Sequence, residues 1–298
     1  MDTELLRTFL VVQEHGSVSV AAASLHLTQP AVSKRIAALE QHFDTALFDR
    51  IGRRLTVTEA GRKLLPQARE ILAKVAETRR ALSNLRDSAE GTLAIATSHH
   101  LGLHRLPPLL REFGTRYPSV DLDIEFLDSE AAYELVTQGE IELAVITLAP
   151  TIDPRLESRE VWRDPLCFVC AKDHSLANTR RLTLASLGEH RAILPSLSTY
   201  TGRILAALFD DAGVRLPQRM TTNYLETIRT MVGIGLGWSL LPETMLDAEL
   251  HRLPVEAPPL FRRLGYIGHR ERTRSNAAAA LINLLDREAN PPSSPGLR

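Results

Sequence analysis

The sequence has few of the residues that mark specialised classes of protein. Only two of its 298 residues are cysteines, at positions 167 and 170, and aromatic residues make up 5% of the chain. Two cysteines cannot build a disulfide framework, which is typical of a reducing compartment. No apolar run reaches the roughly 18 residues that cross a bilayer. The first residues include Asp2 and Glu4, where a signal peptide needs a basic and then an apolar block. These absences predict a protein that stays in the cytoplasm.

A strong net charge is also missing. The chain carries 35 basic and 36 acidic side chains, for a formal charge of −1, which argues against a protein that coats nucleic acid by charge alone. The 44% of hydrophobic residues and the length are enough for about two globular domains. The basic residues of the first ninety positions gather in two clusters. These are Lys34 with Arg35, and Arg50 with Arg53 and Arg54. Any contact with nucleic acid is expected there.

The same region predicts two short helices joined by a tight turn. Residues 18–25 form an alanine-rich run, and a second helix begins at Thr28-Gln29-Pro30, where Thr28 is the N-cap and the proline fits the first turn. One face of the second helix is apolar. The opposite face carries Gln29, Ser33, Lys34 and Arg35. This is what a helix-turn-helix needs to place side chains in the major groove of DNA. The alternative is an ordinary helical hairpin with a solvated polar face.

A specific set of residues runs through this region without a gap. It consists of Ala21-Ala22, Leu25, Thr28-Gln29-Pro30, Ser33, Ile36, Leu39-Glu40, Leu47-Phe48, Arg50, Thr58 and Gly61. The set resembles the N-terminal signature of LysR-type transcriptional regulators. That resemblance implies a winged helix-turn-helix whose residues 29, 30, 33 and 34 face bases while an arginine of the wing enters the minor groove. The DNA-binding residues predicted in this way are Thr28, Gln29, Pro30, Ser33, Lys34, Arg35, Arg50, Arg53 and Arg54.

Three positions depart from the usual pattern of that family. Val18 stands where an aromatic residue is common, Asp44 where glycine normally ends the recognition helix, and Lys34 where arginine is frequent. Aspartate can adopt the left-handed backbone conformation that such a helix end needs, at some cost relative to glycine. Lysine cannot make the planar two-pronged contact of arginine to guanine, so a weaker or altered base preference is expected at Lys34.

From the N-cap Thr58 the pattern predicts one long helix to about Arg86. Its apolar residues alternate in steps of four and three, as a heptad seam does, at Leu64, Ala68, Ile71, Val75, Thr78, Leu82 and Leu85. A seam needs a partner, because the rest of the helix is too polar to be buried on two sides. Pairing predicts a homodimer or a dimer of dimers, a homotetramer, on an inverted-repeat operator in double-stranded promoter DNA. The alternative is a helix packed on its own domain.

Strand-like and helix-like runs alternate over residues 91–290, which predicts an α/β fold with βαβ units and a largely parallel sheet. Strands are expected at 92–97, 120–126, 141–147, 166–171, 192–195, 219–222, 238–241 and 264–267. Helices are expected at 106–117, 131–138, 184–187, 202–212, 225–232 and 275–286. Two such halves, with chain crossings near 147–163 and 265–270, resemble the two-lobed effector-binding domain of the LysR family, which is itself similar to periplasmic solute-binding folds.

These observations divide the chain into four parts. The predicted parts are a winged helix-turn-helix domain at 1–58, a linker and dimerisation helix at 59–90, an effector-binding domain at 91–290 and a disordered tail at 291–298. The effector-binding domain is expected to have lobes of about 91–163 with 268–290, and of 164–267.

Hydroxyl-bearing residues follow three of the predicted strands, each just before a helix. Ligands of such sheets lie at the carboxyl ends of the strands, near helix N-termini that favour anions. We therefore expect a small polar or anionic effector at Thr97, Ser98, His99, His100, Thr147, Ser196, Ser198, Thr199, Tyr200, Thr201 and Asn223. The alternative for each site is simple N-capping. Residues 96–99 and 200–203 also resemble the sulfur-metabolism branch of the family, whose pocket accepts sulfate-like anions, although His100 and Leu101 depart from that branch.

The remaining patterns predict neither a metal, a cofactor nor an enzyme. His99, His100 and His104 include a pair four residues apart, His100 and His104, but no third metal ligand can be recognised in the sequence. Cys167 and Cys170 fall in a predicted strand, where residues three apart point to opposite faces, so two buried thiols are expected. The glycines at 233, 235 and 237 follow a helix and predict a turn. An enzyme with an α/β fold is a third possibility, but the sequence contains no recognisable set of catalytic residues. A solute-binding or transport protein with the same two-lobed fold is the alternative function.

Overall fold

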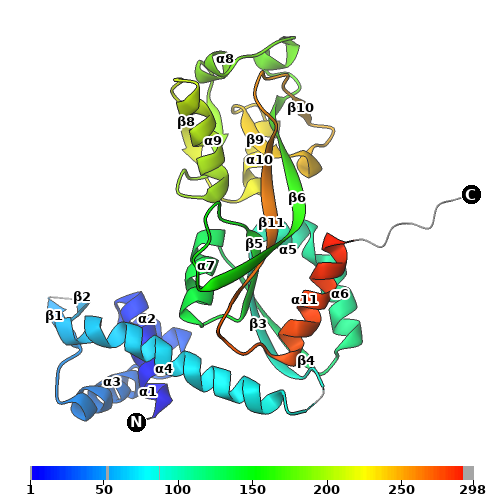
Figure 1. Cartoon of the computed structure of the whole chain (residues 1–298). Coiled ribbons are helices and arrows are strands. Elements are labelled where there is room, and N and C mark those ends of the chain that lie inside the picture. Colours follow the sequence, from blue (N-terminus) through cyan, green and yellow to red (C-terminus); the bar gives the residue numbers. More distant parts are fainter. Residues whose placement is uncertain (1, 52–53, 87, 291–298) are drawn as a thin grey trace, which may run out of the picture. The chain divides into compact units, whose positions relative to one another are not determined.

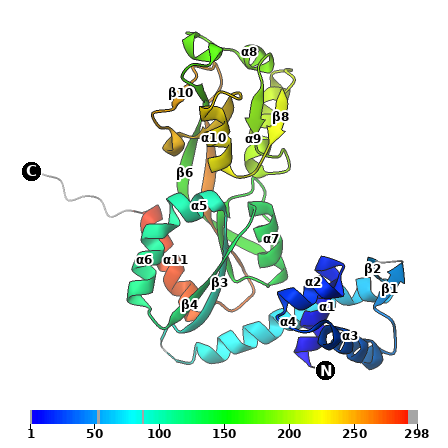
Figure 2. The ribbon, with the colours of Figure 1, turned by 180° about the vertical axis from the view of Figure 1, so that it is seen from behind.

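The computed structural model describes residues 2–51, 54–86 and 88–290. These residues fall into two compact units, which divide the chain into Met1–Arg86 with Gln138–Glu140 and Asp87–Thr137 with Ile141–Arg298. Arg53 and the predicted tail at 291–298 lie outside the described residues. Figures 1 and 2 show the ribbon of the chain from two opposite sides.

The first unit is helical, with one small hairpin of strands. Its elements are α1 (Thr3–His15), α2 (Val18–Ser24), α3 (Gln29–Phe43), β1 (Phe48–Ile51), β2 (Arg54–Val57) and α4 (Glu59–Ser83). β1 and β2 are antiparallel. The side chains of Ser17, Thr28 and Thr58 each accept a backbone N–H and so cap α2, α3 and α4. The predicted helix-turn-helix and its wing are both present.

The core of this unit is built where the three first helices meet. Leu6 and Phe9 of α1 are fully buried, and so are Ala21 of α2 and Val32 and Leu39 of α3. The small alanine lets the helix backbones approach closely. The turn between α2 and α3 contains His26 at φ 52°.

Asp44 follows α3 in the left-handed conformation, with φ 49° and ψ 40°. The expectation that aspartate takes the place of glycine at this helix end is confirmed. α4 ends at Ser83, and Asn84 caps it. The prediction that the helix reaches Arg86 was therefore wrong by about one turn, and Leu85, the last residue of the predicted seam, lies beyond the helix.

The second unit has two lobes of α/β structure. The first lobe contains β3 (Gly91–Thr97), α5 (His99–His104), α6 (Leu106–Arg116), β4 (Val120–Phe126), α7 (Ser129–Gln138), β5 (Leu143–Thr147) and α11 (Asn276–Ala289). The second lobe contains η1 (Ser175–Asn178), α8 (Leu184–Gly188), β7 (Ala192–Leu194), α9 (Tyr200–Asp211), β8 (Gln218–Thr221), α10 (Leu225–Gly233), β9 (Ser239–Pro242), η2 (Glu243–Met245) and β10 (Leu250–Arg252).

Two long strands run through both lobes, β6 (Leu156–Ala171) and β11 (Leu260–His269). They are antiparallel neighbours, as Figure 1 shows. The sheet order is β10-β6-β11-β5-β3-β4, with β9 also paired to β6. Only the pairs of β3 with β4 and β5 are parallel in this sheet. The prediction of a largely parallel sheet was wrong. The sheet is mixed because the chain leaves the first lobe along β6 and returns along β11 in the opposite direction, which needs no crossover helix.

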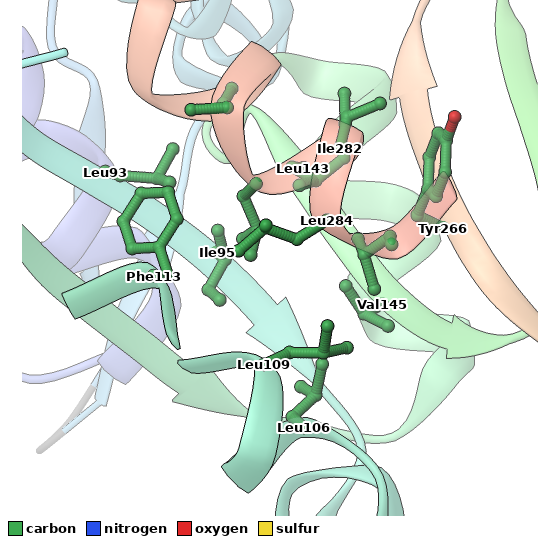
Figure 3. Packing of buried hydrophobic residues seen from close by; sticks show 14 of the residues in the cluster. Leu93, Ile95, Leu106, Leu109, Phe113, Leu143, Val145, Tyr266, Ile282 and Leu284 are labelled. Carbon is green, nitrogen blue, oxygen red and sulfur yellow. The ribbon is translucent and has the colours of Figure 1, made fainter. Parts of the chain in front are cut away.

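The two faces of the first lobe's sheet are both covered. On one face Leu93 and Ile95 of β3 pack with Phe113 of α6 and with Leu281 and Leu284 of α11, as Figure 3 shows in part. A separate buried cluster on the other side involves α7. Because α5 and α7 begin directly beyond β3 and β4, this packing holds the strand ends and the residues that follow them in fixed positions.

Candidate functional site

The outer face of α3 carries the residues predicted to read bases. Gln29, Pro30 and Lys34 are exposed and Ser33 is partly exposed, whereas Val32 is fully buried. Thr28 is exposed, and its hydroxyl accepts the N–H of Ala31 at 3.4 Å, so capping already accounts for this residue. The helix therefore presents a continuous polar face to solvent.

Arg35 differs from its neighbours. Its guanidinium donates to the Thr8 hydroxyl at 3.2 Å and lies 3.6 Å from the Glu4 carboxylate, so it ties α3 to α1. Arg50 and Arg54 fall in the two wing strands β1 and β2, and Arg53 lies outside the described residues.

The C-terminal half of α4 leaves apolar side chains uncovered. Leu64 is partly buried and Ala68 is fully buried in the core of the first unit. Ile71 is 37% exposed and Leu82 is 63% exposed. One chain thus buries the start of the predicted seam and leaves its second half accessible.

A pocket lies between the two lobes of the second unit, with about 510 Å³ of empty space including its mouth. Eight of the eleven predicted effector residues line it: Ser98, His99, His100, Thr147, Thr199, Tyr200, Thr201 and Asn223. Thr97, Ser196 and Ser198 are not in the lining. Six lining residues were not predicted: Asp128, Ser129, Glu130, Pro195, Leu225 and Arg262.

Hydrogen bonds within the protein account for much of the turn after β7. The Ser196 and Ser198 hydroxyls are 2.7 Å apart and bond to each other. Thr199 caps α9 by accepting the Gly202 N–H at 3.0 Å. In the first lobe the buried Thr97 hydroxyl donates to the Val145 carbonyl at 2.8 Å. For these four residues the N-capping or structural interpretation fits best.

Other hydroxyls remain available to a ligand. Ser98 stands at the N-cap of α5 yet its side chain makes no capping hydrogen bond. Thr201 lies in the first turn of α9, is 8% exposed and faces the pocket. Ser98 belongs to the first lobe and Thr201 to the second, so the pair spans the pocket.

A carboxylate from the first lobe occupies the N-terminus of α9. Glu130, in the first turn of α7, accepts the backbone N–H of Tyr200 at 2.5 Å and lies 3.5 Å from Arg203. Burial raises the pKa of Glu130. Nearby, Asp128 accepts a hydrogen bond from the Asn223 amide at 2.6 Å. These two contacts join the lobes on one side of the pocket.

The one cationic side chain in the pocket lining is already paired. Arg262 of β11 is 4% exposed, and its Nε and Nη2 donate to the same oxygen of Asp164 at 3.1 and 2.5 Å. Asp164 is its direct cross-strand neighbour on β6. Burial lowers the pKa of Arg262, while the fully buried Asp164 opposes that shift. The pair joins β6 to β11 where these strands pass between the lobes. Among the described lining residues, no arginine or lysine side chain is therefore free to bind an anion.

Sequence reasoning could have found part of what it missed. Asp128, Ser129 and Glu130 follow the predicted strand 120–126 after a single residue, Leu127, so the argument used for the other strand ends applies to them as well. Arg262 gives no local signal, because its role depends on pairing with a residue 98 positions away.

The two cysteines lie on opposite faces of β6, as predicted. Cys167 packs in one buried cluster of the second lobe and Cys170 in another, and both are free thiols. Burial raises the pKa of each thiol to about 11. Neither has the exposed, acidic thiol of a redox motif.

Two family models match the chain. Residues 3–62 match the bacterial regulatory helix-turn-helix protein of the lysR family, and residues 86–290 match the LysR substrate binding domain. The chain therefore belongs to the LysR family. It is a DNA-binding transcriptional regulator with a substrate-binding domain, and its family consists of regulators rather than enzymes. The alternative of a solute-binding or transport protein was wrong.

Similar curated proteins are also regulators of this family. A probable RuBisCO transcriptional regulator of Cyanidioschyzon merolae is 31% identical over 92% of this chain and 93% of its own length. The CysB regulator of Haemophilus influenzae is 28% identical over 85% of this chain and 79% of its own length. An uncharacterised regulator of Azotobacter vinelandii is 60% identical over 36% of this chain and 75% of its own length. These identities support the family and do not select its sulfur-metabolism branch.

Solved structures share the fold. The crystal structure of CbnR, a LysR family transcriptional regulator, superposes with a TM-score of 0.67 at 20% identity, covering 97% of this chain and 99% of that one. The effector-binding domain of QuiR in complex with shikimate superposes with a TM-score of 0.61 at 16% identity, covering 67% of this chain and 98% of that domain. None of the helices in the described ranges has the length and hydropathy needed to span a bilayer.

Proposed function

We propose that this regulator binds an inverted-repeat operator as a homodimer or dimer of dimers, with α3 in the major groove. Gln29, Ser33 and Lys34 read base edges, and Arg50, Arg53 and Arg54 of the wing contact the backbone or the minor groove. The polar face of α3 and the exposed apolar half of α4 support this assignment. Arg35, held by Thr8 and Glu4, positions α3 rather than reading a base. In this proposal the domains follow the boundaries predicted at residues 58 and 90.

The ligand of the second unit is a small polar effector bound between the lobes. Its polar groups meet the hydroxyls of Ser98 and Thr201, and its anionic group takes the place of the Glu130 carboxylate at the N-terminus of α9. One observation carries this step: the N–H of Tyr200 already holds a carboxylate, that of Glu130. A helix N-terminus favours negative charge, and α9 has twelve residues. The effector then shifts the population of lobe arrangements, by as much as its affinities for them differ.

The substitution Glu130→Gln tests the charge of the effector. Small carboxylates and oxyanions are first screened by their effect on the melting temperature, and the hit is titrated against wild type and variant. Removing the competing carboxylate should tighten binding of an anionic effector about two- to fivefold. Glu134→Gln, on the exposed side of the same helix α7, is the matched control and should bind like wild type. Weaker binding by Glu130→Gln would show that the effector donates to Glu130 and is not held there as an anion.

A further inference from the structure

Three potential metal ligands meet where α5 of the first lobe faces α10 of the second. His100 and His104 lie one turn apart on α5, and Glu226 lies in the first turn of α10. Glu226 Oε1 is 2.9 Å from His104 Nε2 and 3.8 Å from His100 Nδ1. One ligand atom from each of the three lies within 4.8 Å of the other two. The structure thus identifies Glu226 as a third potential ligand, which could not be recognised in the sequence.

His100 is the unusual member of this cluster. Its side chain is 3% exposed, and neither ring nitrogen has a hydrogen-bond partner. A buried polar atom without a partner costs free energy, and an ion or an ordered water that completes the site is one explanation for such an atom in a native protein. Burial lowers the pKa of His100, and both ring nitrogens are left without a protein partner.

The charges around the cluster leave room for a cation. Arg262 is the nearest buried positive group, and it is bonded to Asp164. Arg105, at the end of α5, also contacts Asp164, at 3.5 Å. Asp164 and Glu226 therefore offset these two arginines.

We infer that His100, His104 and Glu226 form a binding site for a divalent transition-metal ion of the zinc type. Two imidazole nitrogens and one carboxylate oxygen are a ligand set of many zinc sites, in which a fourth position is left for water or a ligand. Bonds of about 2.0–2.1 Å to the metal require the three atoms to move closer together than they lie here. His104, 40% exposed, and Glu226, 33% exposed, have the freedom to do so.

Such an ion would connect the two lobes. α5 follows β3 of the first lobe and α10 follows β8 of the second, so bound metal would favour lobe arrangements in which these helices stay together. His100 also lines the effector pocket, which places the ion beside the proposed effector. The inference itself concerns only metal binding and holds whether or not the effector proposal is correct.

The test uses the full-length chain after treatment with a chelator. Zn²⁺ is titrated in competition with a chromogenic chelator, and Co²⁺ is added separately as a spectroscopic probe. Wild type should bind one Zn²⁺ at this site and should give the visible absorption of Co²⁺ in a four-coordinate site. Mutation of a residue that only hydrogen-bonds to a metal ligand costs about 10- to 100-fold in metal affinity. His104→Ala and Glu226→Gln each remove a ligand itself, so we expect each to lower Zn²⁺ affinity at least about tenfold.

Matched controls separate this site from incidental zinc binding. His251→Ala and Glu249→Gln remove the same types of side chain from elsewhere in the second lobe and should bind Zn²⁺ like wild type. Zn²⁺ should also raise the melting temperature of wild type and of both controls but not of the two test variants. If His104→Ala lowers the melting temperature without metal, His104→Gln replaces it. Equal Zn²⁺ affinity in wild type and in the double variant His104→Ala/Glu226→Gln would overturn the inference.

Discussion

Neighbouring side chains on α3 have different roles, since some are exposed toward solvent and others hold the helix in place. Ser33 is partly exposed beside the fully buried Val32, and Arg35 reaches back to Thr8 at 3.2 Å. A hydrogen bond to a base edge carries sequence information, whereas a contact to phosphate adds affinity for any sequence. The two kinds of residue can therefore be told apart by measuring binding to the operator and to random DNA.

We expect Ser33→Ala or Gln29→Ala to reduce the preference for the operator over random DNA, because each base-edge contact contributes about 1–3 kcal/mol. Arg53→Ala or Arg54→Ala should instead weaken binding to both DNAs and reduce its dependence on salt. Fluorescence anisotropy at several salt concentrations measures both effects. Equal loss on both DNAs for all four variants would show that α3 is not the reading helix.

At the scale of single residues, the sequence predicted positions better than roles. Ser98 and Thr201 could be placed at the pocket because the hydroxyl-rich strand ends of the two lobes were expected to converge on the cleft between them. Ser196 and Thr199 satisfied the same pattern, yet their hydroxyls bond to the backbone of their own turn, where Ser196 accepts the Ser198 N–H and Thr199 accepts the Gly202 N–H. Only the three-dimensional contacts separate these two cases, because a free hydroxyl and a capping hydroxyl have the same local sequence.

Among the elements, α4 changes its environment along its length. Its first turns pack through Ala68 on the core of the first unit, while Leu82 near its end is 63% exposed. The heptad spacing predicted the apolar stripe but not where the helix stops, since its last turn carries no strong stop signal. An exposed apolar stripe of this kind is expected to be covered by a second copy of the helix.

The double substitution Ile71→Asp/Leu82→Asp tests that expectation. It would place carboxylates opposite one another and bury them across the paired helices, which should disrupt the dimer. Sedimentation velocity should show a lower mass and gel-shift assays weaker operator binding. Glu70→Asp/Arg79→Lys, on exposed polar positions of the same helix, is the control and should leave the mass unchanged. A double variant of unchanged mass that still binds the operator would show that the stripe packs within one chain.

The long strands explain why the sheet was the least predictable element. Residues 156–165 of β6 mix buried and exposed positions without the two-residue period of a strand. Only the apolar part from Leu166 onward was therefore predicted as a strand. The partner strand β11 lies about one hundred residues away, and its antiparallel pairing with β6 depends on that distant contact. Local patterns could give most of the helices and the short parallel strands, but not α5 (His99–His104). The mixed sheet and the Asp164–Arg262 pair required the whole chain.

On the scale of the whole molecule, regulation requires that an effector in the pocket changes DNA binding although the pocket residues do not contact DNA themselves. Ser98 and Thr201 belong to the second unit, whereas α3 belongs to the first. An effector that binds one lobe arrangement more tightly shifts the equilibrium only by that difference in affinity. The response to effector and the affinity for operator are therefore separable properties.

The double variant Ser98→Ala/Thr201→Ala should remove the response and keep the operator affinity. If both hydroxyls bond to one polar ligand, each removal leaves a polar group of the ligand unsatisfied, which costs about 1–3 kcal/mol, or about five- to a hundredfold in affinity. Ser196→Ala/Ser198→Ala is the matched control, because these hydroxyls bond to each other outside the lining. A promoter reporter across effector concentrations, combined with a gel shift without effector, measures both properties. An unchanged dose response in Ser98→Ala/Thr201→Ala would contradict this site and direct the search to Thr147 and Asn223.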